Sequence, residues 1–146
     1  MRIPHHHDME DFRSVLALTE GKYCTAEPYI EGSYDLRIQK LGDTIRTFKR
    51  TGVSGAWKTN TGTSMCEEIP TTERYTIWAT EASKMFGGLA ICTVDALCCA
   101  KTGQEYILEV NGTSSGLFPA REDEDNQCIK EIAISQLNDY IAAGEL

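Results

Sequence analysis

The sequence predicts an α+β domain in which a largely antiparallel sheet is flanked by helices. Strand-like segments rich in β-branched and aromatic residues occur as neighbouring pairs, and a short turn joins the members of each pair. Segments with helical periodicity precede, separate and follow these pairs. This order of helix, strands, helix, strands and helix is typical of α+β proteins.

Composition limits the classes of function. The chain has 146 residues, of which 41% are apolar and 25% charged, and this suits one globular domain. The net charge of −8 argues against binding through overall charge to nucleic acid, which we do not expect as a partner. No apolar run reaches membrane-spanning length and no secretory signal is visible, so we expect a cytoplasmic or peripheral protein. The cysteines form no CxxC pair, which favours free thiols.

The first elements follow an expected disordered stub at residues 1–7, which carries three adjacent histidines. Asp8 can cap a short helix with one apolar face. Residues 23–30 predict a strand at a sheet edge or a strand end, because Pro28 cannot donate a hydrogen bond to a β-ladder.

The first predicted hairpin turns at Gly42-Asp43, because a two-residue loop with glycine first suits a type II′ turn. The register that this turn implies places Asp35 opposite Arg50, with Arg37 on the same face of the sheet. The Asp35–Arg50 pair can be a surface salt bridge of little energetic value. Alternatively, it holds Arg37 and Arg50 near an anionic ligand.

The segment 54–65 is polar, contains several glycines and carries Trp57 and Lys58. Such a loop can simply be exposed, or its backbone amides, hydroxyls and ammonium group can bind phosphate.

The clearest helix opens at residues 70–72 and ends at Gly87-Gly88. Apolar side chains recur at helical spacing and predict one buried stripe, formed by Tyr75, Trp78, Ala79, Ala82, Met85 and Phe86.

The second predicted hairpin covers residues 90–111 and turns around Thr102. Pairing outward from this turn gives three cross-strand pairs on one face: Asp95 with Glu109, Thr93 with Asn111, and Leu97 with Ile107. Two carboxylates directly opposite each other repel. A divalent cation would reverse that effect, because hard cations take carboxylate oxygens as ligands. The alternative is a solvated hairpin face with incidental acids.

The final helix follows a flexible loop at residues 112–116 and an acidic run at residues 121–125. Acids at a helix N-terminus suit the helix dipole, so this run is interpreted as structural. Helical spacing predicts a buried face formed by Ile129, Ile132, Ala133, Leu137, Tyr140 and Ile141. The domain is expected to span residues 8–142, with a tail at 143–146.

The sequence also resembles a known family, the synapsins, and within it the C-terminal half of the ATP-grasp domain. The resemblance extends from about residue 8 to about residue 137. The matching runs are Thr-Ala-Glu-Pro-Tyr-Ile at 25–30, Tyr-Asp-Leu-Arg-Ile-Gln-Lys at 34–40, Val-Ser-Gly-Ala-Trp-Lys-Thr-Asn-Thr-Gly at 53–62, Phe-Gly-Gly-Leu at 86–89 and Asp-Glu-Asp at 123–125. The Trp-Lys-Thr-Asn-Thr-Gly run is specific to synapsins, whereas the Asp…Glu-x-Asn pattern at 95, 109 and 111 is shared by ATP-grasp proteins.

The resemblance implies ATP and either Mg²⁺ or Ca²⁺ as ligands. The implied adenine linker is Glu27, Pro28, Tyr29 and Ile30, and the implied basic positions near the nucleotide are Arg37, Arg50 and Lys58. The implied metal ligands are Asp95, Glu109 and Asn111. At two of these positions, Asp95 and Asn111, the residues match those of ATP-grasp ligases; vertebrate synapsins place a glutamate at the position of Asp95.

The function implied is that of an ATP- and divalent-metal-binding protein, peripheral on synaptic vesicles in the presynaptic cytoplasm. It would regulate neurotransmitter release without established catalysis, form homo-oligomers, and contact the vesicle surface and actin. The alternative is an ATP-grasp carboxylate–amine ligase that acts through an acyl phosphate. Because an ATP-grasp site closes between two lobes, we expect the other lobe to lie upstream in a longer protein, or ATP binding to be impaired.

Overall fold

The computed structural model describes residues 3, 5, 8–18, 23–52 and 64–144 of the chain. The chain divides into two compact units, Met1–Ile30 and Glu31–Leu146. In the first unit, helix α1 (Asp8–Ala17) begins at the predicted capping residue, whose carboxylate accepts a hydrogen bond from the backbone N–H of His5. Residues 23–30 form no strand, so this prediction was wrong. This segment forms no β-ladder with another strand of the described residues. Strand propensity alone does not hold an extended segment in a sheet.

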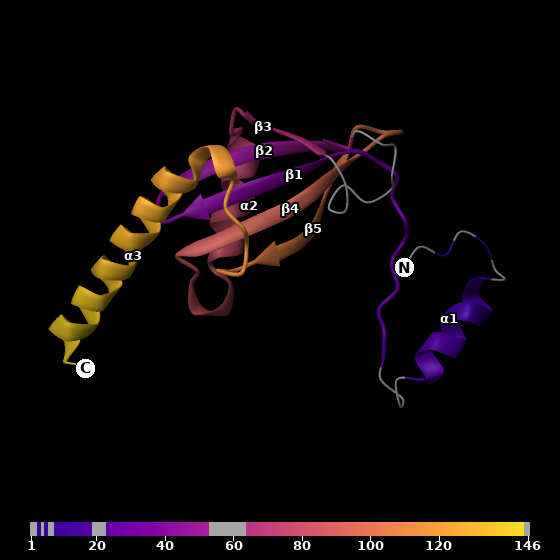
Figure 1. Ribbon diagram of the computed structural model, residues 1–146, viewed down its shortest axis with the longest axis horizontal. Coiled ribbons are helices and arrows are strands. Elements are labelled where there is room, and N and C mark those ends of the chain that lie inside the picture. The colour runs from indigo at the N-terminus through magenta and orange to yellow at the C-terminus, as the bar shows by residue number, and fades with distance from the viewer. Residues whose placement is uncertain (1–2, 4, 6–7, 19–22, 53–63, 145–146) are drawn as a thin grey trace. The chain divides into compact units, whose positions relative to one another are not determined.

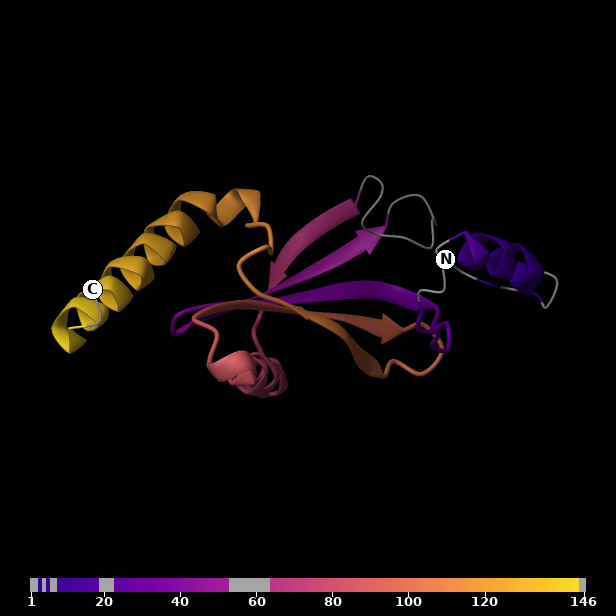
Figure 2. The same cartoon turned by 90° about the horizontal axis from the view of Figure 1, so that it is seen from below.

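The second unit is built on a five-stranded antiparallel sheet with the order β3-β2-β1-β4-β5. Its strands are β1 (Gly32–Leu41), β2 (Thr44–Gly52), β3 (Ser64–Ile69), β4 (Ile91–Cys99) and β5 (Glu105–Asn111). Helix α2 (Glu73–Ser83) packs on one face, and the segment after β5 crosses to the other face, where α3 (Glu122–Ala143) begins (Figures 1 and 2). The α+β prediction is confirmed. Strand β3 was missed, because its sequence lacks the apolar–polar alternation that marks a half-buried strand.

The β1–β2 hairpin has the predicted register, in which Asp35 lies opposite Arg50. Gly42 takes a φ of 57° at the turn, a left-handed conformation that glycine adopts without steric cost. The β4–β5 hairpin keeps the predicted Asp95–Glu109 and Thr93–Asn111 pairs. A β-bulge next to Asp95 shifts the remaining pairs by one residue. Leu97 therefore faces Tyr106, and the predicted Leu97–Ile107 pair is wrong.

The hydrophobic core lies between α2 and the sheet. Its buried members are Leu36, Ile38, Tyr75, Ala79, Val94 and Ala96, with Trp78 and Ala82 packed against them. The hydroxyl of Thr72 caps α2 by accepting a hydrogen bond from the Tyr75 N–H. The predicted stripe fails at Met85 and Phe86, because α2 ends at Ser83. Phe86 has a left-handed φ of 54° and is 85% exposed, where the chain turns back toward β4.

Helix α3 is attached to the sheet by its first turn. Asp125 is fully buried and forms an ion pair with Arg46 of β2, so the structural interpretation of the acidic run holds at this residue. The buried face predicted for α3 does not extend to its C-terminal half: Leu137, Tyr140 and Ile141 are 50%, 55% and 57% exposed. Periodicity detects an apolar face but does not supply the surface that would cover it. Among the helices that the structure describes, none is both long enough and apolar enough to cross a membrane.

Candidate functional site

The face of the sheet opposite α2 carries a cluster of charged side chains around Asp95. This residue lies in the middle of β4, is 6% exposed and pairs with Arg37 of β1 in the β1–β4 register. Arg37 donates from Nε to Asp95 Oδ1 at 3.1 Å and from Nη2 to Oδ2 at 3.4 Å. Arg50 of β2 adds a contact from Nη2 to Oδ1 at 3.5 Å. Two guanidinium groups therefore compensate the charge of a nearly buried carboxylate, which without partners would be very costly to bury.

Asn111 connects this carboxylate to the second one. Its Nδ2 donates to Asp95 Oδ2 at 3.0 Å and to Glu109 Oε1 at 3.1 Å. The predicted pair of facing acids is thus present, but the sequence argument omitted the groups that relieve its repulsion. The amide of Asn111 and the two guanidinium groups stabilise the carboxylates without any cation, so the facing acids alone do not demand a metal.

The donor set nevertheless fits a hard divalent cation. Asp95, Glu109 and Asn111 together present carboxylate and amide oxygens, the ligands that Mg²⁺ and Ca²⁺ prefer. Turning the Asn111 amide about its last torsion would exchange Nδ2 for Oδ1 beside both carboxylates. No group of three or more His, Cys, Asp or Glu residues suited to a metal occurs in the described residues. Two carboxylates and one amide leave coordination positions for phosphate oxygens or water, which is the usual arrangement around Mg²⁺.

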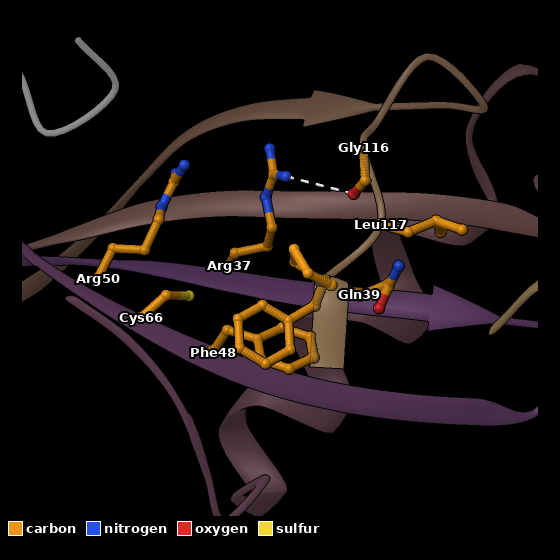
Figure 3. A pocket seen from close by; sticks show the side chains of 9 residues that line it. Arg37, Gln39, Phe48, Arg50, Cys66, Gly116 and Leu117 are labelled. Carbon is orange, nitrogen blue, oxygen red and sulfur yellow. Dashed lines mark hydrogen bonds between the residues drawn. The ribbon is translucent and has the colours of Figure 1, made fainter. Parts of the chain in front are cut away.

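A pocket of about 270 Å³ opens beside this cluster, on the other side of Arg37 from Glu109. Figure 3 shows Arg50 at one end, Arg37 in the middle and Gln39 at the other end. The complete lining consists of Arg37, Gln39, Phe48, Arg50, Cys66, Gly116, Leu117, Phe118 and Pro119.

The segment after β5 forms one wall of this pocket. The rings of Phe48 and Phe118 have centroids 4.5 Å apart, and the carbonyl of Gly116 accepts a hydrogen bond from Arg37 Nη1 at 3.4 Å. The hydroxyls of Ser115 and Thr93 are 2.7 Å apart and attach the segment to β4. The loop predicted to be flexible is therefore tied to the sheet by these contacts.

Burial shifts the pKa of two further groups on this face. Burial raises the pKa of the Cys66 thiol, although Arg50 and Arg37 act in the opposite direction. Burial also raises the pKa of Asp35; Arg50 opposes this shift and the charge of Asp95 adds to it. The thiol in the pocket is consequently a poor nucleophile at neutral pH, because the thiolate is the reactive form.

The remaining predicted residues belong to the first unit or lie outside the described residues. Glu27, Pro28 and Tyr29 are exposed and Ile30 is half-buried, and all four belong to the first unit. Lys58 lies outside the described residues, as does the whole run at 53–62.

Sequence reasoning missed the pocket. Gln39 could have been found, because it lies two residues from Arg37 on the same face of β1. Cys66 faces Arg50 only through the β2–β3 pairing, and Phe118 reaches Phe48 only through the path of the chain after β5. No local pattern in the sequence indicates either contact.

The fold and the charged face define a class: an α+β domain of the ATP-grasp type, with one face of its sheet covered by a helix and the other bearing acidic and basic side chains. Comparison with known proteins gives the family. A family model described as "Synapsin, ATP binding domain" matches residues 1–139, and the chain belongs to the synapsin family. It is similar to the protein named Synapsin from Drosophila melanogaster, with 36% identity over 115 residues. That match covers 79% of this chain and 11% of the relative, so the chain spans a small part of the relative's length.

Proposed function

We propose that this chain binds ATP together with a divalent cation on the polar face of its sheet, next to Asp95. The observation that carries the proposal is the convergence of Asp95, Glu109 and Asn111, with Arg37 and Arg50 beside them. Oxygen ligands and guanidinium groups on one surface suit a phosphate chain with its cation. The match to the ATP-binding domain of synapsins supports the same ligand.

Each group then has a distinct task. Asp95, Glu109 and Asn111 would hold Mg²⁺ or Ca²⁺, and Arg37 and Arg50 would offset phosphate charge. The family resemblance adds Lys58 near the phosphates and residues 27–30 around adenine. A cation held there would supply positive charge next to the phosphate oxygens.

The nucleotide acts in this proposal as a conformational ligand, since a ligand stabilises the state to which it binds. The synapsin relationship supports a role on the cytoplasmic surface of synaptic vesicles, in the control of neurotransmitter release, with the vesicle surface and actin as partners. Self-association is supported by the exposed apolar side chains of α3, among them Leu137, Tyr140 and Ile141.

Calorimetric titration of ATP with Mg²⁺ or Ca²⁺, into this chain and into its Glu109→Gln variant, tests the proposal. Glu109 is largely exposed on β5, so the variant should keep its fold while losing one charged metal ligand. We expect metal-dependent binding to the original chain and clearly weaker binding to the variant. Equal heats from both proteins would remove Glu109 from the site, and the absence of binding to either would contradict the proposal.

A second candidate function is an ATP-grasp ligase, favoured by Asp95 and Asn111, which match the ligase pattern. In such an enzyme the cation and the arginines would stabilise the charge that develops during phosphoryl transfer. Release of ADP and phosphate only in the presence of a carboxylate and an amine would support it. ATP binding without turnover across a panel of such substrates would exclude it.

A further inference from the structure

The carboxylate of Asp95 is fully engaged by donors from the described part of the chain. An ionised carboxylate offers about four lone-pair positions on its two oxygens. Its Oδ1 accepts from Arg37 Nε at 3.1 Å and Arg50 Nη2 at 3.5 Å, and its Oδ2 accepts from Asn111 Nδ2 at 3.0 Å and Arg37 Nη2 at 3.4 Å. A cation therefore gains Asp95 as a ligand only when one of these donors leaves.

The guanidinium group of Arg37 is engaged in the same way. Its Nε and Nη2 donate to Asp95, and its Nη1 donates to the carbonyl oxygen of Gly116 at 3.4 Å. Each of its three nitrogens already holds an acceptor, so a phosphate group that binds an edge of Arg37 must displace one of them. The ligand-free chain thus pairs the two charges with each other, and each charge masks the other from its own ligand.

Arg37 is the donor best placed to leave Asp95. Its side chain is 26% exposed, compared with 18% for Arg50. It also lines the open pocket beside the cluster, which gives the guanidinium group room to turn (Figure 3). Because Arg37 contacts both oxygens of Asp95, its departure frees one lone-pair position on each of them.

We propose that Arg37 exchanges partners: it pairs with Asp95 while the site is empty and pairs with phosphate when nucleotide and cation bind together. Asp95 then offers the two vacated positions to the cation. A cation without phosphate would leave Arg37 next to an added positive charge, and phosphate without a cation would leave the 6% exposed Asp95 short of a counter-charge. The site therefore favours the two ligands together over either one alone. This inference rests on the proposed function, because it takes Asp95 as the point where both ligands meet.

The exchange makes the binding of the two ligands cooperative. Coupling between two ligands of one protein typically changes the affinity for each by about 5- to 150-fold, and the effect is reciprocal. The variant Arg37→Gln has no guanidinium group to mask the carboxylate or to receive phosphate. We expect ATP to increase the affinity for Mg²⁺ about tenfold more in the original chain than in Arg37→Gln.

Calorimetric titration of the 146-residue chain and its variants with Mg²⁺, without and with ATP, measures this effect. The association of Mg²⁺ with ATP in solution is common to all the proteins and cancels in the comparison. Arg121→Gln is the matched control, because Arg121 pairs with Glu68 and Glu124 and not with Asp95. This control should keep the full effect of ATP.

The Nε–H signal of Arg37 in the NMR spectrum of the isotope-labelled chain follows the exchange directly. The signal is assigned through its bonds to the backbone of Arg37. Mg²⁺ alone should leave it nearly in place, whereas Mg²⁺ with ATP should shift it as the bond to Asp95 breaks. The Nε–H of Arg121, which donates to Glu68 at 2.9 Å, should keep its position throughout.

Three results would overturn the proposal. The Arg37 signal stays in place while Mg²⁺ and ATP bind, Mg²⁺ alone shifts it as far as both ligands do, or ATP has the same effect on Mg²⁺ affinity in Arg37→Gln. Should that variant not fold, the signals of the original chain decide the question. Binding of ATP and Mg²⁺ without movement of Arg37 contradicts only the exchange, whereas the absence of any ATP binding contradicts the nucleotide site and the exchange with it.

Discussion

Replacing Arg37 by glutamine should raise the affinity of the chain for a divalent cation in the absence of nucleotide. Arg37 donates to both oxygens of Asp95. A cation at Asp95 must therefore either displace this guanidinium or bind next to it. The substitution removes the competing positive charge and leaves the carboxylate to the cation.

The magnitude follows from the geometry. Arg37 Nη2 lies 3.4 Å from Asp95 Oδ2. A Mg²⁺ ion on that oxygen would be about 2.1 Å from it, so the two positive centres would be at most about 5.5 Å apart. At that distance a single and a double charge repel by about 1.5 kcal/mol even in the dielectric of water. We expect the affinity for Mg²⁺ to increase by about tenfold or more.

The assay is calorimetric titration with Mg²⁺, first alone and then with ATP. Arg74→Gln is the matched control, because Arg74 is an exposed helix residue that pairs with Glu105 and not with Asp95. Both variants change the net charge by the same amount. With ATP present, Arg37→Gln should instead lower the affinity for Mg²⁺, because the guanidinium is proposed to offset phosphate charge. An affinity for Mg²⁺ alone that is unchanged, or that rises equally in Arg74→Gln, would refute the competition at Asp95.

Three further predictions concern groups around this face. Arg46→Met leaves the fully buried carboxylate of Asp125 unpaired, and urea titrations should show the free energy of unfolding lowered by about 3–5 kcal/mol. The double variant that also carries Asp125→Leu should recover most of this loss. Burial raises the pKa of Asp35, so the stability contributed by its neutral form is complete below pH 3.8 and is lost as the pH rises through the pKa of the folded state. Asp35→Asn should remove this loss. An identical dependence of unfolding free energy on pH in both proteins would contradict the prediction. Hydrogen bonds from Thr102 lower the pKa of Cys99, while burial raises the pKa of Cys66. Mass spectrometry should therefore find Cys99 alkylated before Cys66, and the opposite order would contradict these pKa shifts.

The turns determined how much of the sheet could be predicted. Gly42-Asp43 fixed the β1–β2 register, and the turn around Thr102 placed Asp95 opposite Glu109. Both are local relations, in which a short loop dictates which residues face each other. The sequence contains no signal for the bulge next to Asp95. The bulge changed only the cross-strand pairs that lie between it and the turn.

The contacts that define the site depend on pairings between distant segments. Arg37 meets Asp95 because β1 lies beside β4, and no periodicity within either strand indicates that neighbour. The sequence therefore suggested repulsion between Asp95 and Glu109, while the folded chain surrounds them with donors. The same reason explains α3, where the spacing of apolar residues indicated a buried face at Leu137 although nothing in the helix specifies what covers it.

The central claim is that a cation and ATP bind at Asp95, Glu109 and Asn111. Paramagnetic Mn²⁺ with ATP, added to the isotope-labelled chain, tests it most directly, because NMR signals broaden steeply with proximity to the ion. We predict that the amide signals of these three residues broaden first, while that of Ala79 in α2, on the opposite face of the sheet, stays sharp. Broadening concentrated at the acidic first turn of α3, with Asp95 and Glu109 unaffected, would contradict the account.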